Sequence, residues 1–390
     1  MFSNRINNIK ESSIVKYNNL VIQKEKEGIH FYKLNIGQPD ILTDIIYFEE
    51  LRKYKQCINS YSDPKGLIEL RKVVSSYYNK KIKRNKYNHN DIVITQGASD
   101  AIIKILLTLC DSGDEIIVLE PFFSDYKLYC SLLDINIKSI KYENVNYSDI
   151  QKCISNKTKA ILFANPNNPD GNILKNDDIE IILSIAKENN LFVISDEVYN
   201  EILFTNDFIS LSNYDSENII VVDSASKKLN CCGSRIGFVI SKNDKLISKI
   251  VVINDSKISL SNIEQKCVSA LLLNYKKITK NSISIFKRRL EILKKELDKH
   301  NIKFIIPKGG MSILLELPIK NSDDYAHWLI NNYNKNGESL VVTSAKDFYI
   351  SDDGNNKIRI TLTIDEDNLN KVVYILVDSL KKYSLEVTTC

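Results

Sequence analysis

The stretch IIVVDSASKKLNCCGSRIGFVI, residues 219–240, decides the fold. It begins and ends with short apolar runs, Ile219 to Asp223 and Gly237 to Ile240, which have the length and composition of buried strands. The polar segment between them carries Lys227 and Arg235. In open α/β sheets, ligands bind beyond the carboxyl ends of the strands. The stretch therefore predicts an α/β protein with a cationic ligand site after one of its strands.

Further apolar runs upstream repeat this pattern. They alternate with helical patterns from about residue 90 onward, which is typical of consecutive βα units and of a mostly parallel sheet covered on both faces. The runs are Asp91 to Thr95, Glu115 to Leu119, Ala160 to Ala164 and Leu191 to Ser195. We expect the loops that follow these strands to meet at one edge of the sheet.

The pattern changes after Tyr275. Four apolar residues then recur at helical spacing and predict a long amphipathic connecting helix: Phe286, Leu290, Leu293 and Leu297. Strand-like runs at Met311 to Leu317 and Lys357 to Thr363, with helices after them, predict a second, smaller α+β domain. We expect three parts: residues 1–45 as an N-terminal segment packing with the small domain, 46–280 as the large cofactor-binding domain, and 281–390 as the small domain.

The composition favours a soluble globular protein and gives no sign of an acidic partner. Lys and Arg number 53 against 49 Asp and Glu, so the charge balance gives no support to nucleic-acid binding. The N-terminus lacks the apolar core of a signal peptide, and no apolar run approaches the roughly 20 residues that span a bilayer. We therefore expect a cytoplasmic protein without membrane contact. The 8 cysteines and 4 histidines show no disulfide or metal spacing, so no metal site is expected.

Three charged side chains point to a cofactor. Pyridoxal phosphate needs an amine that holds its aldehyde as a Schiff base, a carboxylate that keeps its ring nitrogen protonated, and a cation with hydroxyls for its phosphate. Lys227, Asp196 and Arg235 supply these groups, and Ser224 and Ser226 add hydroxyls. Asp196 ends an apolar strand, where a carboxylate without a cationic partner is costly to bury. The residues therefore predict pyridoxal 5′-phosphate as the cofactor.

Other candidates each have a structural alternative. Gly97-Ala98-Ser99 is either a plain strand-to-helix turn or a phosphate site at a helix N-terminus. Phe123 is either a core residue or an aromatic plate for the pyridine ring. Asn168 lies in a loop rich in turn formers and can donate to the phenolic oxygen of the cofactor, which Tyr199 can also reach. Arg359 is either an exposed strand arginine or a fork for the α-carboxylate of a substrate.

Taken together, the motifs resemble a known family. SxSKxxxxxGxRxG at residues 224–237, NPNNPxG at 165–171 and DExY at 196–199 occur in the order and spacing of the fold type I, class I/II aminotransferases of the aspartate aminotransferase superfamily. The resemblance extends from Gly37 to Arg359. It implies a mostly parallel large domain with a smaller α+β domain, and an enzyme that uses pyridoxal phosphate.

The resemblance also implies a role for each site residue. Lys227 would form the internal Schiff base and Asp196 would pair with the ring nitrogen, while Gly37, Asn168 and Arg359 would hold the substrate. The other implied contacts are Asn168 and Tyr199 at the phenolic oxygen, Phe123 on the ring, and Ala98, Ser99, Ser224 and Arg235 at the phosphate. Tyr61 opens a YxxxxGxxxLR stretch. The family pattern implies that this tyrosine reaches the phosphate of the partner subunit, in a homodimer.

The expected reaction is transamination between an amino acid and a 2-oxo acid by a ping-pong mechanism, with Lys227 moving the proton. Another carbanion fate on the same fold, such as β-elimination, decarboxylation or cyclisation, stays open. Ser224 to Lys227 also fits the SxxK motif of serine acyl-transferring enzymes, but their SDN and KTG motifs are absent from the sequence. A ligand sensor of this fold would carry a DNA-binding module before Gly37, and we expect the residues there to be too few for one. Departures from the family pattern are Asp170 in place of Thr, Ser99 where aspartate-using members of one subgroup have Lys, and Ser344-Ala345 in place of proline-glycine.

Overall fold

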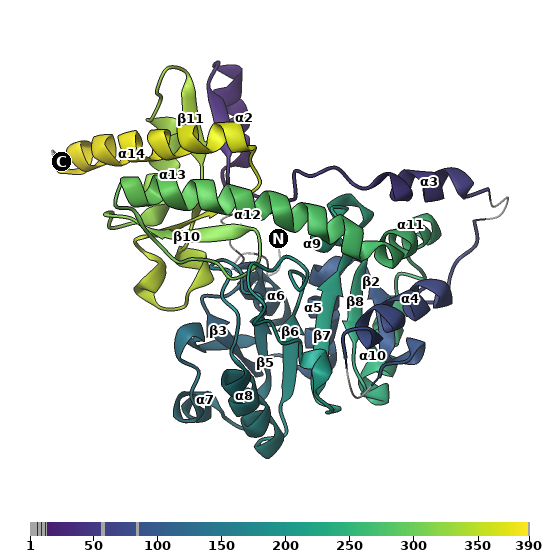
Figure 1. Ribbon diagram of the computed structural model, residues 1–390. Coiled ribbons are helices and arrows are strands. Elements are labelled where there is room, and N and C mark those ends of the chain that lie inside the picture. The colour runs from purple at the N-terminus through teal and green to yellow at the C-terminus, as the bar shows by residue number, and fades with distance from the viewer. Residues whose placement is uncertain are drawn as a thin grey trace.

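A seven-stranded sheet forms the centre of the larger part of the molecule (Figure 1). The computed structural model describes residues 6, 9, 12, 14–55, 59–82 and 86–388. The strands of this sheet are β2 (Ile92–Thr95), β3 (Glu115–Glu120), β4 (Asn136–Lys141), β5 (Thr158–Ala164), β6 (Phe192–Asp196), β7 (Ile219–Ser224) and β8 (Gly237–Ile240). Their order is β2-β8-β7-β6-β5-β3-β4, and β8 alone among them runs antiparallel to its neighbours. The mostly parallel sheet is confirmed.

Helices cover both faces of this sheet, because consecutive strand residues point to opposite sides. In β3, Ile116 and Val118 belong to one core cluster and Ile117 and Leu119 to the other. The helices of the large part are α3 (Ile45–Lys53), α4 (Ile68–Asn79), α5 (Gly97–Leu109), α6 (Asp125–Leu133), α7 (Tyr147–Cys153), α8 (Asn176–Glu188), α9 (Ala225–Lys228), α10 (Asp244–Asp255) and α11 (Asn262–Leu273). Short 3-10 helices lie at His89–Asp91, Tyr142–Asn144, Leu211–Asn213 and Cys232–Ser234.

The long helix α12 (Tyr275–Lys299) leads from the large part to a smaller one. Its expected apolar residues, Phe286, Leu290, Leu293 and Leu297, are all buried. The smaller part holds a four-stranded antiparallel sheet in the order β12 (Thr343–Ser344), β13 (Lys357–Thr361), β10 (Ser312–Glu316) and β9 (Lys303–Phe304). It also contains α13 (Ser322–Asn331), α14 (Glu366–Thr388) and the 3-10 helices Lys346–Phe348 and Asp352–Gly354.

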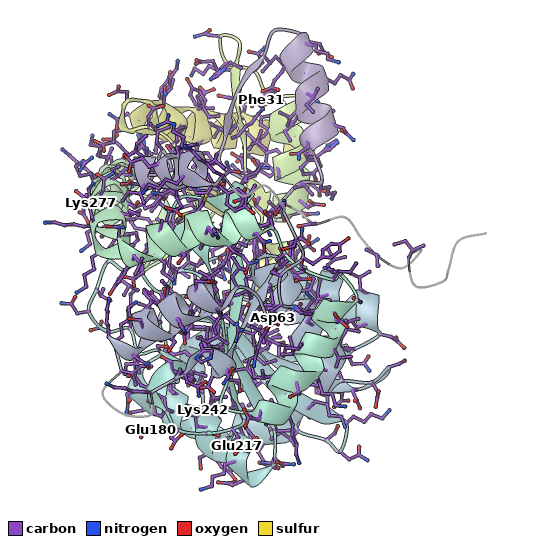
Figure 2. All side chains as sticks on the ribbon, turned by 90° about the vertical axis from the view of Figure 1, so that its right-hand side faces the viewer. Phe31, Asp63, Glu180, Glu217, Lys242 and Lys277 are labelled. Carbon is purple, nitrogen blue, oxygen red and sulfur yellow. The ribbon has the colours of Figure 1, made fainter. Side chains whose placement is uncertain are left out.

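The N-terminal segment joins this smaller part rather than the large sheet. The strand β1 (His30–Lys33) pairs in parallel with β11 (Glu338–Val341), and α2 (Asn18–Lys26) precedes it. Figure 2 shows Phe31 at the far end of the molecule from Glu217 and Lys242, which lie in the large part. After β1 the chain crosses back toward the large part. This crossing segment contains Asn35, Ile36 and Gly37, and the last two lie beside residues of both parts.

The helix α3 lies at the outer edge of the large part (Figure 1). Tyr47 on this helix donates to Glu264 of α11 at 2.7 Å, which fixes one of its faces. Its other face exposes apolar side chains, since Ile45 is 55 % and Phe48 is 43 % exposed, and Leu42 just before it is 90 % exposed. Among the described helices, none has the length and apolar character of a membrane span.

Candidate active site

A cavity of about 270 Å³ lies at the carboxyl ends of the parallel strands, where both parts of the molecule contribute side chains. It brings together all of the predicted site residues except Tyr61. Those that line it are Gly37, Ala98, Ser99, Phe123, Asn168, Asp196, Tyr199, Ser224, Ser226, Lys227, Arg235 and Arg359. They come from loops after five different strands and from the crossing segment. The topology therefore explains why residues up to 322 positions apart share one site.

Lys227 reaches the cavity from α9, the single-turn helix that follows β7 directly. Its Nζ donates to the carbonyl oxygen of Gly37. Within the described residues, no carboxylate forms an ion pair with this amine. Burial lowers the pKa of Lys227, and the guanidinium groups of Arg359 and Arg235 act in the same direction, while Cys232 and Asp196 oppose the fall. A larger share of this amine is therefore neutral and nucleophilic at a given pH than for a solvated lysine.

Asp196 ends β6 and is 5 % exposed. Tyr126 of α6 donates its hydroxyl to Asp196 Oδ2 at 3.0 Å, and the Val198 amide donates to Oδ1 at 3.4 Å. Burial raises the pKa of Asp196 to about 6, and these two hydrogen bonds oppose the rise. Because no cation among the described residues pairs with this carboxylate, a ligand that brings a positive charge would be held strongly here. The motif pattern gave no signal for Tyr126.

Arg359 is a buried residue of β13, so it is not an exposed strand arginine. Its Nη1 donates to Asn168 Oδ1 at 3.2 Å, and its Nη2 donates to the Thr343 hydroxyl at 3.2 Å and to the Asn35 carbonyl. Its Nε is buried without a hydrogen-bond partner. Burial lowers the pKa of Arg359 to about 10. All these acceptors are neutral, so the guanidinium is oriented but not neutralised, as suits a site for a carboxylate.

Asn168 and Tyr199 both face the cavity near this arginine. Because the side-chain oxygen of Asn168 accepts from Arg359, its Nδ2 is the group that can donate into the cavity. Burial raises the pKa of Tyr199, and the charge of Arg359 opposes the rise. The phenol therefore stays protonated and can serve as a second donor. Phe123 presents its ring to the cavity and packs edge-on against Tyr126, with centroids 5.6 Å apart.

Glycines bring the N-terminus of α5 against Arg235. Gly97 has φ +84°, and a Cβ at this position would lie 2.5 Å from Arg235 Nη2. A Cβ at Gly237 would lie 2.4 Å from the backbone of Gly97. The close approach places a guanidinium beside the first amides of a 13-residue helix, at Ala98 and Ser99. Both the guanidinium and the helix N-terminus favour an anion, so this end of the cavity suits a phosphate.

Three features noted in the sequence lie away from the cavity wall. Tyr61 is 78 % exposed on the outer surface and contributes nothing to the cavity of its own chain. Asp170 is buried and accepts from Asn167 Nδ2 at 2.8 Å and from Asn172 Nδ2 at 2.7 Å. This bonding closes the loop beside Asn168 without contacting that residue. Ser344 is buried and its hydroxyl lies 2.8 Å from the Ser322 hydroxyl.

The next residue of α9 after Lys227 is a buried lysine. Lys228 has a fully buried side chain, and its Nζ forms an ion pair with Asp223, whose side chain is also fully buried. Asp223 further accepts from the Tyr78 hydroxyl at 2.8 Å and from Asn200 Nδ2 at 3.2 Å. The sequence gave no reason to single out this pair. Among the described residues, no group of three or more His, Cys, Asp or Glu side chains can hold a metal ion.

The fold and the cavity together define a fold type I enzyme, and comparisons with known proteins identify the family. The family model described as aminotransferase class I and II matches residues 29–376. The chain belongs to this family and is a transaminase, in agreement with the sequence motifs. Members of the family use pyridoxal phosphate.

The similar proteins carry several specific names. The chain is 27 % identical over 327 residues to an aspartate aminotransferase of Thermotoga maritima, which covers 81 % of this chain and 85 % of that protein. It is 27 % identical over 397 residues to a (5-formylfuran-3-yl)methyl phosphate transaminase of Methanocaldococcus jannaschii, covering 98 % and 100 %. A solved structure of Thermus thermophilus aspartate aminotransferase with maleate superposes with a TM-score of 0.89 at 22 % identity, covering 97 % of this chain and 99 % of that one.

Proposed function

We propose that this transaminase moves an amino group between an amino acid and a 2-oxo acid in two half-reactions, with pyridoxal 5′-phosphate attached to Lys227. The observation that carries the proposal is the pairing, in one cavity, of an amine and a carboxylate that both lack an ionic partner among the described residues, Lys227 and Asp196. When bound, the cofactor supplies an aldehyde for attachment and a protonated ring that withdraws electrons from the substrate Cα.

The residues of the chain then have distinct tasks. Asp196 holds the ring nitrogen through its buried carboxylate, while Tyr126 keeps that carboxylate in place. Asn168 and Tyr199 donate to the phenolic oxygen, and Phe123 stacks on the ring. Ala98, Ser99, Ser224, Ser226 and Arg235 surround the phosphate.

The substrate is held and deprotonated by three further groups. Arg359 and the backbone at Gly37 bind the α-carboxylate, so the Cα proton is directed toward Lys227 Nζ. Lys227 Nζ would take this proton from the substrate Cα, because its lowered pKa leaves a share of the amine neutral, and the resulting ammonium would be the proton donor for the next step.

A half-reaction tests the proposal. The holoenzyme, incubated with an amino acid but no acceptor, should release about one equivalent of 2-oxo acid per site and then stop, as a ping-pong mechanism requires. Adding a 2-oxo acid should restart it. Continuous release of ammonia, carbon dioxide or a cyclic product without an acceptor would instead indicate β-elimination, decarboxylation or cyclisation. Borohydride reduction followed by peptide mass analysis should place the cofactor on Lys227.

We also propose that the active unit is a homodimer. The exposed apolar face of α3, with Ile45 and Phe48, and the exposed Leu42 form a surface suited to a second copy of the chain. Tyr61 would extend from this region to the phosphate in the site of the partner subunit. Light scattering should give twice the chain mass, and Tyr61→Phe should weaken cofactor binding without changing that mass.

Two further parts of the proposal concern organisation. We propose the division into residues 1–45, 46–280 and 281–390, which is supported by the separate core of the smaller part and by the pairing of β1 with β11. Limited proteolysis should cut first near these boundaries. A cytoplasmic location is supported by cysteines that are free thiols throughout the described residues.

A further inference from the structure

Two apolar residues of the cavity wall have no part in the proposed binding of the cofactor. These are Ile14 and Ile36, which both line the cavity. Asn35 connects them to Arg359, because the Asn35 carbonyl accepts from Arg359 Nη2 and Asn35 Nδ2 donates to the Ile14 carbonyl at 2.7 Å. Asn35 is itself buried, at 4 % exposure. The position of Ile14 is therefore fixed, through one amide side chain, relative to the guanidinium that is proposed to bind the substrate carboxylate.

Ile36 lies between two residues whose carbonyl groups accept hydrogen bonds from the side chains proposed to act on the substrate. Its chain neighbours are Asn35, whose carbonyl accepts from Arg359, and Gly37, whose carbonyl accepts from Lys227. Thr363 holds the Ile36 carbonyl at 3.3 Å from the other side. Although it lines a cavity, the Ile36 side chain is 39 % exposed. An apolar side chain held open to the cavity in this way gains from an apolar occupant.

A carboxylate lies on the opposite side of the same segment. Ser12 donates its hydroxyl to Asp125 Oδ1 at 2.8 Å, and the Ile14 carbonyl accepts from Asn35 Nδ2, so Ser12 is tied to the start of α6 and Ile14 to Asn35. Asp125 lies close enough to Arg359 for each to affect the charge of the other. Asp125 does not line the cavity, so its negative charge would act on a second substrate carboxylate only through space, in addition to the apolar wall formed by Ile14 and Ile36.

We propose that Ile14 and Ile36 form the subsite for the substrate side chain, and that the enzyme selects amino acids with uncharged, apolar side chains over dicarboxylic ones. The inference rests on the proposed function, because it places the substrate α-carboxylate at Arg359. A carboxylate driven against an apolar wall loses hydration without gaining a partner, while each buried CH₂ group strengthens binding about fourfold. The subsite would therefore both weaken the binding of dicarboxylic substrates and strengthen the binding of apolar ones.

Binding of unreactive carboxylic acids to the holoenzyme tests the subsite without turnover. Hexanoate, succinate and acetate represent an apolar side chain, a second carboxylate and no side chain. At pH 8, calorimetry should show hexanoate binding at least about tenfold more tightly than succinate. Ile14→Ala and Ile36→Ala should each weaken hexanoate binding by roughly fourfold to tenfold and leave acetate binding unchanged.

Two other variants complete the test. Ile22→Ala removes an exposed isoleucine of α2 that does not line the cavity, and it should change none of the three affinities. Asp125→Asn keeps an acceptor for Ser12 but removes the charge, so it should strengthen succinate binding several-fold and leave hexanoate binding unchanged. Succinate binding as tightly as hexanoate, or isoleucine variants that weaken acetate as much as hexanoate, would overturn the inference.

A donor screen separates this inference from the proposed function. Leucine, methionine and phenylalanine should exceed aspartate and glutamate at least about tenfold in kcat/KM for 2-oxo acid formation. If aspartate or glutamate is the better donor, transamination stands and the apolar subsite is wrong. If no donor yields a 2-oxo acid while hexanoate still binds as described, the proposed reaction is wrong and the subsite stands.

Discussion

Two adjacent lysines on α9 face opposite sides of the molecule and have opposite environments. Lys227 faces the cavity, donates to a backbone carbonyl and has no carboxylate partner among the described residues. Lys228 faces the core, is fully buried and forms an ion pair with Asp223. The two amines therefore differ in whether a carboxylate partners them. Burial without such a partner lowers the pKa of Lys227, which is the amine predicted to react.

The carboxylates of the neighbouring strands β6 and β7 repeat this contrast. Asp223 has Lys228, Tyr78 and Asn200 as partners on the core side. Asp196 on the cavity side has only two hydrogen-bond donors, and its pKa is raised to about 6. The core side thus holds a neutralised pair, and the cavity side holds unpaired groups of both signs. The difference indicates that the charges of the cavity are arranged for a ligand.

Replacing each lysine of α9 in turn tests this difference with the largest expected effects. Lys227→Ala should lower kcat by about 10⁴-fold or more, since it removes both the attachment point and the group that moves the proton. The thermal stability of this variant should hardly change, because the Lys227 amine has no ionic partner among the described residues. Steady-state kinetics and thermal unfolding measure the two effects. Substantial turnover by this variant would show that another amine does the chemistry.

Lys228→Met should have its main effect on stability. Removing one member of a buried ion pair leaves Asp223 without its cationic partner, which costs about 3 to 5 kcal/mol in the free energy of unfolding. Denaturant unfolding measures this loss. The double variant Lys228→Met with Asp223→Leu should recover most of it, since it removes the stranded charge. If the double variant is no more stable than the single one, the pair is not the source of the effect.

The sequence predicted much of this site for identifiable reasons. The strands that carry it are continuous apolar runs, and its motifs are local in the chain. β4 was missed because it is an edge strand with polar Asn136, Lys138 and Lys141. Contacts between distant segments were missed as well: Arg359 and Asn35 are 324 residues apart, and no local pattern records such a pair. The motif predicts that Lys227 is the reactive amine, but only the structure shows that Lys228 is paired with Asp223.

Asp196→Ala tests the carboxylate on the cavity side. It should lower kcat by about 10² to 10³-fold, because the charge-assisted bond to the ring nitrogen acts where negative charge develops. Asp196→Asn should retain some cofactor binding but recover little activity, since an amide does not stabilise a protonated ring nitrogen. Single-turnover kinetics separates the chemical step from product release. Near-normal rates in both variants would mean that the ring nitrogen is held elsewhere.

Asp170 extends the comparison to a buried carboxylate whose partners are amides. Burial raises its pKa to about 6, above the ordinary value of 3.8. A raised carboxyl pKa adds stability below the unfolded value, and that stability is lost as the pH rises through the folded value. Between pH 4 and pH 7, wild type should therefore lose roughly 3 kcal/mol in unfolding free energy relative to Asp170→Thr. Equal pH dependence of the two proteins without cofactor would show that Asp170 is not perturbed.

The smallest effect is expected where the guanidinium geometry changes but the charge does not. Arg359 is oriented by Asn168, Thr343 and Asn35, and a lysine cannot keep these bonds while presenting two parallel donors to a carboxylate. Arg359→Lys should weaken amino-acid binding about tenfold, which is about 1.4 kcal/mol, and leave cofactor affinity unchanged. Parallel titrations with the best amino acid and with the cofactor measure both quantities. If the variant instead loses affinity for the cofactor and keeps its affinity for the substrate, Arg359 contributes to cofactor binding and the substrate carboxylate binds elsewhere.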